Sequence, residues 1–190
     1  LGTLYAYRGL ADLALKAYEN AYDYSIQLKD STLISNSYSC LGRVSTLNND
    51  WTKGLDYYKK AIGIAEQAGS LKALTLAYGE IVTVYRSLSM LDSCMYYLDK
   101  SKKIEEKHNI SALPQTYLGI GETYYCMGQS DSAYFYLEKA LNTTNPYTKQ
   151  DATQTLYYLC RDLGKYEDAI QYNEQYWIYK DSVDNINRSS

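Results

Sequence analysis

The sequence of 190 residues predicts an all-α protein in which antiparallel helix pairs stack into a solenoid. Three observations predict this fold. A segment of 36 to 40 residues recurs along the chain in five copies. Each copy carries two apolar stripes at helical spacing with a tight turn between them, and one position in every copy holds a small residue. A helical hairpin of this kind buries its stripes only against its neighbours, so we expect the copies to stack.

The copies can be aligned at an apolar residue in the middle of the first helix of each pair. Successive copies are separated by 40, 40, 39 and 36 residues at this position. Five copies in register are far more than chance spacing would produce. The aligned residues are Leu1, Leu41, Ile81, Ile120 and Leu156.

The register divides the chain into one partial and four complete copies. Because Leu1 aligns with the middle of a first helix, we expect the chain to begin inside a copy. Residues 184–190 are polar, and two interpretations are open for them: a solvated tail or the start of a linker helix. We predict a single array over residues 1–183, with the partial copy at 1–30 and the complete copies at 35–70, 75–110, 114–147 and 150–183.

The third complete copy shows how each hairpin is built. Apolar and aromatic residues follow the three- and four-residue steps of one helix face up to Tyr124. Gly128 then breaks the helix, and we expect Ser130 to cap the second helix. We expect that second helix to end at Asn145 and Pro146, because proline lacks an amide donor and disfavours helix at the residue before it.

The position that is always small lies in the second helix of each copy. A small side chain there lets two antiparallel helices approach closely, whereas a large one would overpack the interface at a cost of ~1–3 kcal/mol. A larger residue fills the adjacent space one turn later. The small residues are Ala14, Gly54, Cys94, Ala133 and Ala169, and the larger ones include Tyr18, Tyr58, Leu98 and Leu137.

In order and spacing these positions resemble the tetratricopeptide repeat, whose pattern is an aromatic residue, Leu-Gly, a tyrosine, a turn glycine and two alanines. The resemblance covers nearly the whole chain and implies a right-handed α-solenoid of stacked antiparallel helix pairs. The copies exceed the usual ~34 residues, and the surplus falls near residues 67–71 and 106–111, where we expect a longer second helix or exit loop. The matching residues are Tyr38, Leu41, Gly42, Tyr58 and Ala61 in one copy, and Tyr117, Ile120, Gly121, Tyr124, Gly128, Ala133 and Ala140 in another.

Composition and motifs argue against several function classes. A net charge of −3 without a basic block disfavours nucleic-acid binding, and no apolar run reaches the ~18–20 residues that a membrane span needs. The four cysteines are far apart and the one histidine, His108, lies near a predicted helix end, so we expect reduced, mostly buried cysteines and no metal or cofactor. Without a P-loop, an HExxH motif or a distinctive carboxylate pair, we expect no enzymatic activity. We assign Glu105, Glu106 and Asp162 to charged, solvent-facing surfaces.

The resemblance also implies that the first helices line a concave face on which a partner would bind. Arginine pairs with carboxylates, and tyrosine offers apolar area with one hydroxyl, so their mixture suits an extended peptide. The alternative is that these side chains are solvated and pair with one another. The candidate groove residues are Tyr7, Arg43, Leu47, Thr83, Arg86, Glu122, Tyr125, Tyr158 and Arg161.

The sequence therefore predicts a scaffold that binds a protein or peptide partner. Some family members hold the C-terminal carboxylate of a peptide with lysines and asparagines, a clamp that the equivalent residues here do not support. One alternative is a sensory or regulatory segment of a larger membrane-anchored signalling protein, because residues 179–182 resemble the end of such arrays in bacterial regulators. Another is a small-molecule pocket or an unrecognised enzyme. The residues at the clamp positions are Ser39, Gly79, Leu118 and Gln154.

Tyrosine dominates the aromatic residues, with 24 tyrosines against one phenylalanine and two tryptophans. Most of the tyrosines fall at repeat positions, so we expect tyrosine to be the packing aromatic of this fold. Each hydroxyl is then expected to reach water or a backbone partner at the edge of a hairpin. Only Tyr7, Tyr125 and Tyr158 are expected to face the groove.

Overall fold

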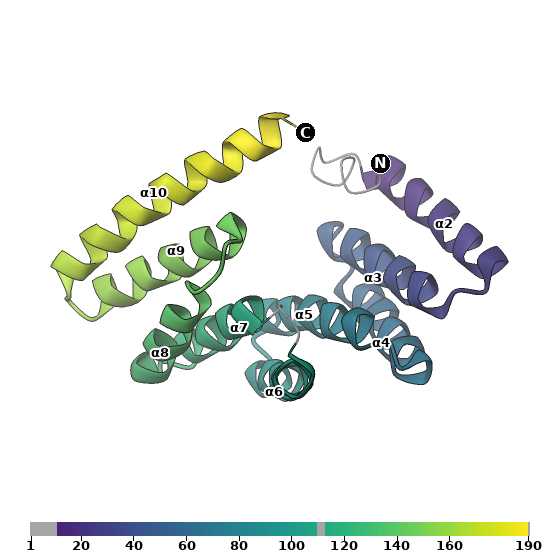
Figure 1. Ribbon diagram of the computed structural model, residues 1–190, viewed down its shortest axis with the longest axis horizontal. Coiled ribbons are helices and arrows are strands. Elements are labelled where there is room, and N and C mark those ends of the chain that lie inside the picture. The colour runs from purple at the N-terminus through teal and green to yellow at the C-terminus, as the bar shows by residue number, and fades with distance from the viewer. Residues whose placement is uncertain (1–10, 110–112, 190) are drawn as a thin grey trace. The chain divides into compact units, whose positions relative to one another are not determined.

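The computed structural model describes residues 11–109 and 113–189 (Figure 1). Every regular element within these residues is an α-helix, which confirms the predicted all-α class. The helices are α2 (Ala11–Leu28), α3 (Ser31–Leu47), α4 (Trp51–Ala68), α5 (Leu71–Ser87), α6 (Leu91–His108), α7 (Leu113–Cys126), α8 (Ser130–Ala140), α9 (Pro146–Asp162) and α10 (Tyr166–Ser189).

The helices belong to two compact units, one ending at Ile104 and the other beginning at Glu105. In the first unit α2 packs on α3, α3 packs on α4 and α5, and α4 packs on α5. In the second unit α7 packs on α8 and α9, α8 packs on α9, and α9 lies beside α10 (Figure 1). Packing between helices that follow one another in the chain is what stacked hairpins require. That residues 1–183 form a single array remains a prediction.

A three-residue turn with one left-handed residue joins the two helices of each pair. This residue is Asn49, Ser89, Gly128 or Gly164, with φ between 57° and 72°. Its amide donates to the carbonyl three residues earlier, and the next amide donates to the carbonyl five residues earlier, all at 2.8–3.0 Å. These two bonds satisfy the last carbonyls of the first helix. All four copies therefore share one turn geometry, although only two of them have glycine there.

The predicted roles of Ser130 and of the Asn-Pro pair are wrong. Ser130 is the first helical residue of α8, whose N-cap is Gln129 without a side-chain capping bond. α8 has already ended before Asn145, which instead caps α9 by accepting the Tyr147 amide at 3.0 Å. Pro146 then occupies the first turn of α9. Proline is favoured there because the first amides of a helix have no partner within it.

The predicted match of small against large residues is confirmed where two helices of a pair touch. A Cβ atom on Gly42 would lie 2.8 Å from Tyr58 Cε1, and one on Gly121 would lie 2.7 Å from Leu137 Cγ. Both contacts are shorter than ordinary van der Waals packing, so neither glycine leaves room for a methyl group. The position that is always small is buried in every copy, at Ala14, Gly54, Cys94, Ala133 and Ala169.

The surplus residues of the longer copies lengthen their second helices. α4 and α6 have 18 residues each, whereas α8 has 11. α10 has 24 residues, so the polar residues 184–189 are helical. Val183 is buried, and the Tyr147 hydroxyl of α9 donates to Asn187 Oδ1 at 2.7 Å. The last turns of α10 are therefore packed on α9.

Tyrosine rings pack against one another along the hairpin edges. The Tyr97 ring lies 5.5 Å from the Tyr78 ring and 5.8 Å from the Tyr85 ring, between centroids. Several hydroxyls reach other side chains instead of the water or backbone expected for them; the Tyr78 hydroxyl, for example, donates to Glu66 Oε1 at 3.3 Å. The same ring arrangement recurs around Tyr136, with Tyr117 and Tyr124, whereas Tyr38, which aligns with Tyr78, packs against Tyr22 and Tyr57.

Candidate functional site

Two clusters of polar and aromatic side chains are built around four of the nine candidate groove residues, namely Arg43, Tyr125, Tyr158 and Arg161. One lies between α3 and α5 in the first unit, and the other lies between α7 and α9 in the second. Tyr7 lies outside the described residues. The repeat pattern places these candidates on equivalent turns of the first helices, which is why the same helix face carries them in each copy.

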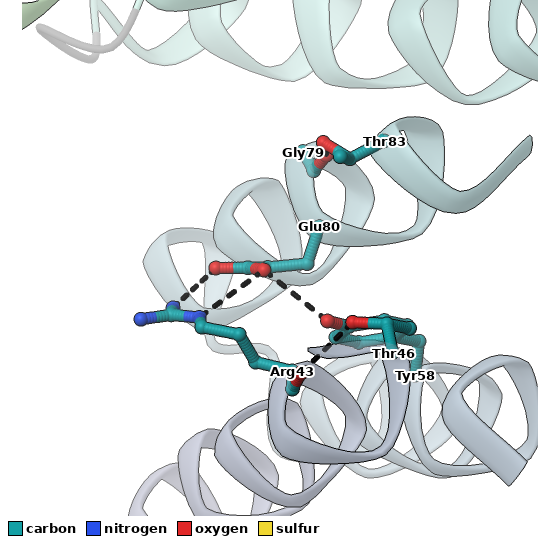
Figure 2. A network of polar contacts seen from close by, with 6 residues as sticks. All are labelled: Arg43, Thr46, Tyr58, Gly79, Glu80 and Thr83. Carbon is teal, nitrogen blue, oxygen red and sulfur yellow. Dashed lines mark hydrogen bonds and ion pairs between the residues drawn. The ribbon is translucent and has the colours of Figure 1, made fainter. Parts of the chain in front are cut away.

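The first cluster is built on an ion pair between Arg43 of α3 and Glu80 of α5 (Figure 2). Arg43 Nε also donates to Glu80 Oε2 at 3.4 Å, and the Tyr58 hydroxyl of α4 donates to the same oxygen at 3.3 Å. The side chains of Arg43 and Glu80 are 38% and 27% exposed. The half-buried pair therefore joins the first helices of two adjacent copies. Tyr58 of α4 stabilises the pair through its hydrogen bond to Glu80.

Glu80 shifts the pKa values of the side chains around it. Burial alone would lower the pKa of Arg43, but the charge of Glu80 and its hydrogen bond raise that pKa above its ordinary value. Burial and the Glu80 charge also raise the pKa of Tyr58. Burial raises the pKa of the Cys40 thiol, so this thiol stays protonated near neutral pH and is a poor nucleophile. The cluster holds a fixed charge pair.

The other first-unit candidates line the same faces of α3 and α5. Thr83 is exposed, and its hydroxyl donates to the Gly79 carbonyl at 3.4 Å, one turn earlier in α5 (Figure 2). Arg86 is half-buried near the end of α5, and Leu47 is exposed at the end of α3. These positions add a hydroxyl, a guanidinium and apolar surface beside the Arg43–Glu80 pair.

The second cluster brings three predicted site residues together around one carboxylate. The Tyr125 hydroxyl of α7 donates to Asp162 Oδ2 of α9 at 2.6 Å. Arg161 donates to Asp162 Oδ1 from Nε at 3.1 Å and from Nη2 at 2.9 Å. The Arg161 guanidinium lies 5.0 Å from the centroid of the Tyr158 ring, within cation–π range. Glu122, the remaining candidate, lies half-buried on α7.

Hydrogen bonding sets the charge states of this second cluster. Burial, followed by the bond to Asp162, raises the pKa of Tyr125 to about 12. Hydrogen bonds from Tyr125 and Arg161 lower the pKa of Asp162. Near neutral pH the site therefore contains a neutral phenol, a carboxylate and a guanidinium. Arg161 and Asp162 are 48% and 46% exposed, so solvent screens their attraction while the geometry holds both in place.

The two carboxylates that organise the clusters are the residues that sequence reasoning missed. Glu80 is absent from the predicted groove, and Asp162 is predicted only as a surface charge. Arg43 and Glu80, like Tyr125 and Asp162, are 37 residues apart, close to one repeat length. A search for polar pairs at about one repeat length is the signal that would have found them.

One predicted surface charge is wrong. Glu105 of α6 is 1% exposed, and the Thr116 hydroxyl of α7 donates to its Oε1 at 2.9 Å. It occupies the repeat position that Ala65 holds one copy earlier, which is buried by the stacking of copies. The stacking geometry thus overrides the preference of a carboxylate for water.

Neither metal-site geometry nor a membrane-spanning helix is found in the described part of the chain. Within residues 11–109 and 113–189, no three His, Cys, Asp or Glu side chains gather as metal ligands would. None of the helices in these ranges combines the length and the apolar character needed to cross a membrane. None of the four cysteines is in a disulfide in the described residues; Cys94 and Cys160 are buried, Cys40 is partly buried, and Cys126 is exposed.

Shallow depressions on the surface lie at two interhelical turns. One, of about 490 Å³, is lined by residues 164–168, and another, of about 420 Å³, is lined by residues 128–132. Both are open to solvent.

Comparison with known proteins adds information about the fold. No protein-family model and no curated protein matches the chain. The crystal structure of BtubC (BKLC) from P. vanneervenii is similar, with a TM-score of 0.76 and 16% identity over 97% of this chain and 78% of that one. A putative kinesin light chain with TPR-like repeats from Podosopora anserina has a TM-score of 0.68 and 14% identity over 96% of this chain and 93% of its own.

A third similar structure is the Rap conjugation gene regulator of the plasmid pLS20 in complex with the Phr* peptide. Its TM-score is 0.78 at 14% identity, and the match covers 98% of this chain but 52% of the regulator. These neighbours are helical-repeat proteins of the tetratricopeptide type, which confirms the predicted resemblance at the level of fold.

Proposed function

With the tetratricopeptide-repeat fold as the premise, we propose that this chain is a protein-interaction module that binds an extended peptide segment of a partner along its first helices. The observation that carries the proposal is the cluster of Tyr125, Tyr158 and Arg161 around Asp162. Hydrogen bonds to Asp162 hold Tyr125 and Arg161, and the Tyr158 ring, which lies against the Arg161 guanidinium, is 36% exposed. Ordered side chains lose little entropy when a ligand binds them.

The chemistry of the second cluster suits a peptide. Tyrosine rings supply apolar contact area, and their hydroxyls and the arginine supply hydrogen bonds to main-chain carbonyls. The pLS20 regulator, which has a similar fold, is solved with a bound peptide. That likeness supports peptide recognition as the function of the first-helix surface here.

The first cluster has a different role in this proposal. Breaking the half-buried Arg43–Glu80 pair would leave a charge without compensation, which costs more than breaking an exposed pair. We therefore assign this pair to fixing the position of α3 against α5. The second cluster, with its more exposed ion pair, is the one assigned to direct contact with the peptide.

The test selects phage-displayed random peptides on the wild-type chain and measures the affinity of a selected peptide by fluorescence polarisation. A variant with Tyr158→Ala and Arg161→Ala should bind at least ~10-fold more weakly, because each anchor contributes about 1–2 kcal/mol. Its far-UV circular dichroism should match that of the wild type. Charge reversal at Arg161 alone should likewise weaken binding at least ~10-fold.

Lys103→Ala is the matched control, since Lys103 is an exposed cation of α6 that pairs with Asp99 at 2.6 Å outside both clusters. This variant should bind the peptide as the wild type does. Unchanged affinity in the Tyr158/Arg161 variant, or an equal loss in the control, would contradict the assignment of the site. A selection that enriches no peptide would contradict the function itself.

A second candidate function is that of a signalling segment in a membrane-anchored regulator. The observation that favours it is α10, whose 24 residues continue as helix through the polar residues up to Ser189. A continuous helix that packs on α9 through its last turns is suited to transmit a shift in packing. The reading frame after Ser190 tests this candidate: a membrane span within a few dozen residues supports it, and a stop codon there rejects it.

A further inference from the structure

One tyrosine pair of the second unit departs from the packing pattern of the repeat. Tyr172 of α10 aligns with Tyr136 of α8, whose ring packs against two tyrosines of its own first helix, α7. In α9, the first helix of the last copy, the positions of those two tyrosines hold Thr153 and Cys160. The ring of Tyr172 instead meets that of Tyr134, which belongs to α8 of the preceding copy.

This contact arranges two phenols and a carboxylate in one hydrogen-bonded chain. The Tyr172 hydroxyl donates to Glu138 Oε1 of α8 at 2.6 Å, and the hydroxyl oxygens of Tyr134 and Tyr172 lie 2.8 Å apart. Because a phenol has one proton to donate, the Tyr134 hydroxyl donates to that of Tyr172. The ring centroids are 6.3 Å apart, and the ring planes meet at 72°. The chain of hydrogen bonds therefore joins the second helices of two successive copies.

Glu138 is placed to accept the proton of Tyr172. Burial, followed by the bond to Glu138, raises the pKa of Tyr172, so this phenol is neutral near neutral pH. A neutral phenol gives up an electron readily when its proton leaves at the same time, because the phenol radical cation is a strong acid. The 2.6 Å distance is typical of a hydroxyl that donates to a carboxylate. Glu138 is exposed, so it can pass the proton on to water.

We propose that Tyr134 and Tyr172 form an oxidative crosslinking site, at which a peroxide-derived one-electron oxidant couples the two rings into dityrosine. A phenoxyl radical carries its unpaired electron on the oxygen and on the ortho and para carbons, and the para carbon of tyrosine is blocked by the rest of the side chain. The ortho carbons flank the hydroxyl, so a bond between two hydroxyls brings ortho carbons of both rings together. In dityrosine the two hydroxyls flank the new bond and stay neighbours, as they already are here.

The coupling removes one electron and one proton from each phenol. The proton of Tyr172 passes to Glu138, and that of Tyr134, whose ring is half-buried, passes to water. The two radicals join through one ortho carbon of each ring, and the hydrogen atom on each of these carbons moves to the oxygen of its own ring, which restores both phenols. One molecule of hydrogen peroxide, activated by a haem peroxidase, takes up the two electrons and two protons and becomes two molecules of water.

A second hydroxyl-bonded pair provides a comparison within the same chain. The hydroxyl oxygens of Tyr22 and Tyr38 in the first unit lie 3.0 Å apart, and their ring centroids are 5.0 Å apart. Neither hydroxyl is bonded to a carboxylate in the part of the chain that the structure describes. If ring distance alone set the rate, this pair would couple first. Because Glu138 accepts a proton in the other pair, we expect Tyr134 and Tyr172 to couple first.

Oxidation of the 190-residue chain with hydrogen peroxide and a haem peroxidase tests the proposal. The chain is kept dilute, and the monomer is isolated by size-exclusion chromatography so that crosslinks between molecules are removed. The monomer should show dityrosine fluorescence. Tandem mass spectrometry of its proteolytic fragments should identify Tyr134 joined to Tyr172 with the loss of two hydrogen atoms.

Tyr134→Phe should lower the yield of crosslinked Tyr172 at least ~10-fold, because the ring held beside Tyr172 can then form no phenoxyl radical. Tyr166→Phe is the control, since it removes an exposed tyrosine from the first turn of the same helix and should leave the yield unchanged. The far-UV circular dichroism of both variants should match that of the wild type.

Glu138→Gln tests the proton acceptor. The amide keeps the shape of the side chain but is a far weaker base, so the initial rate of crosslinking should fall at least ~10-fold. Glu174→Gln, at an exposed carboxylate of α10, should leave the rate unchanged. A wild-type monomer without the Tyr134–Tyr172 crosslink, an equal yield in Tyr134→Phe, or a crosslink at Tyr22 and Tyr38 that forms first would overturn the proposal. An unchanged rate in Glu138→Gln would overturn the role of Glu138.

Discussion

The contact between Gly121 and Leu137 shows how much of this fold depends on single atoms. Leu137 fills the space that a side chain at position 121 would occupy, with its Cγ 2.7 Å and its amide nitrogen 3.0 Å from the position of a Cβ atom. The amide nitrogen belongs to the helix backbone, so it cannot move aside without shifting α8. Gly63 of α4 is the opposite case, because a Cβ atom there would meet nothing within 4 Å.

Alanine substitution at these two glycines should therefore change stability in opposite directions. Gly121→Ala should lower the free energy of unfolding by about 1–3 kcal/mol, through overpacking against Leu137. Gly63→Ala should raise it by about 0.5–1 kcal/mol, because alanine is the better helix former and finds open space. Urea unfolding followed by circular dichroism measures both, and a stabilising Gly121→Ala would refute the close-packing argument.

Asp162 and Glu80 are site residues that the sequence alone did not identify. The helix pattern identified Arg43, Tyr125 and Arg161 as residues of the first-helix face, and the structure places each of them beside a carboxylate. Charged residues on a helix face are usually solvated, so pattern alone gives no reason to single out these two. Their role depends on contacts between helices one repeat apart, which periodicity within one helix does not report.

At the scale of helices and turns, the repeat copies use one turn geometry with different residues. The left-handed position is glycine at Gly128 and Gly164 but serine at Ser89, where φ is 57°. A non-glycine residue in this conformation is strained by its Cβ atom.

Replacing Ser89 with glycine should stabilise the first unit. The change relieves the strain of the left-handed conformation, and we expect a gain of about 0.5–1 kcal/mol in the free energy of unfolding. The measurement is the urea midpoint of Ser89→Gly against the wild type. Ser70→Gly, at a turn position with φ of −83°, is the control and should not be stabilised. No gain at Ser89 would mean that its side chain compensates the strain.

Helices and their order could be predicted from the sequence, whereas some of their ends could not. The apolar stripes and the small-residue position depend on packing that every copy repeats, so the same pattern is visible five times in the sequence. Asn145 and Pro146 are ambiguous signals, since an Asn-Pro pair suits the end of one helix and the start of the next equally well. The fold resolves the ambiguity by ending α8 early and using the pair to begin α9.

At the scale of the whole molecule, the abundance of tyrosine makes stability sensitive to alkaline pH. Burial raises the pKa of Tyr58, Tyr78 and Tyr172 above the ordinary value of 10.0, and it raises that of Tyr125 to about 12. In the unfolded chain these phenols lose their protons near pH 10, while the folded chain retains them. The folded state therefore binds more protons in this range, and stability must fall as pH rises.

Below pH 10 these tyrosines should thus leave the free energy of unfolding unchanged. From pH 10 towards pH 12 they should make it decline. Tyr125→Phe removes one of the contributing groups and should make the decline shallower. Urea midpoints of the wild type and the variant, measured at intervals across this range, provide the test. Parallel pH curves for the two proteins would show that the Tyr125 hydroxyl does not contribute.

The packing of each helix on its neighbours in the chain has a consequence for biosynthesis. Short turns connect most consecutive helices, and the contacts within each unit join helices that are adjacent in sequence or one helix apart. Such local contacts close early and at low entropic cost. A hairpin that has left the ribosome can therefore bury its apolar stripe against the hairpin made just before it, so that a unit assembles in the order of translation and exposes little apolar surface at any stage.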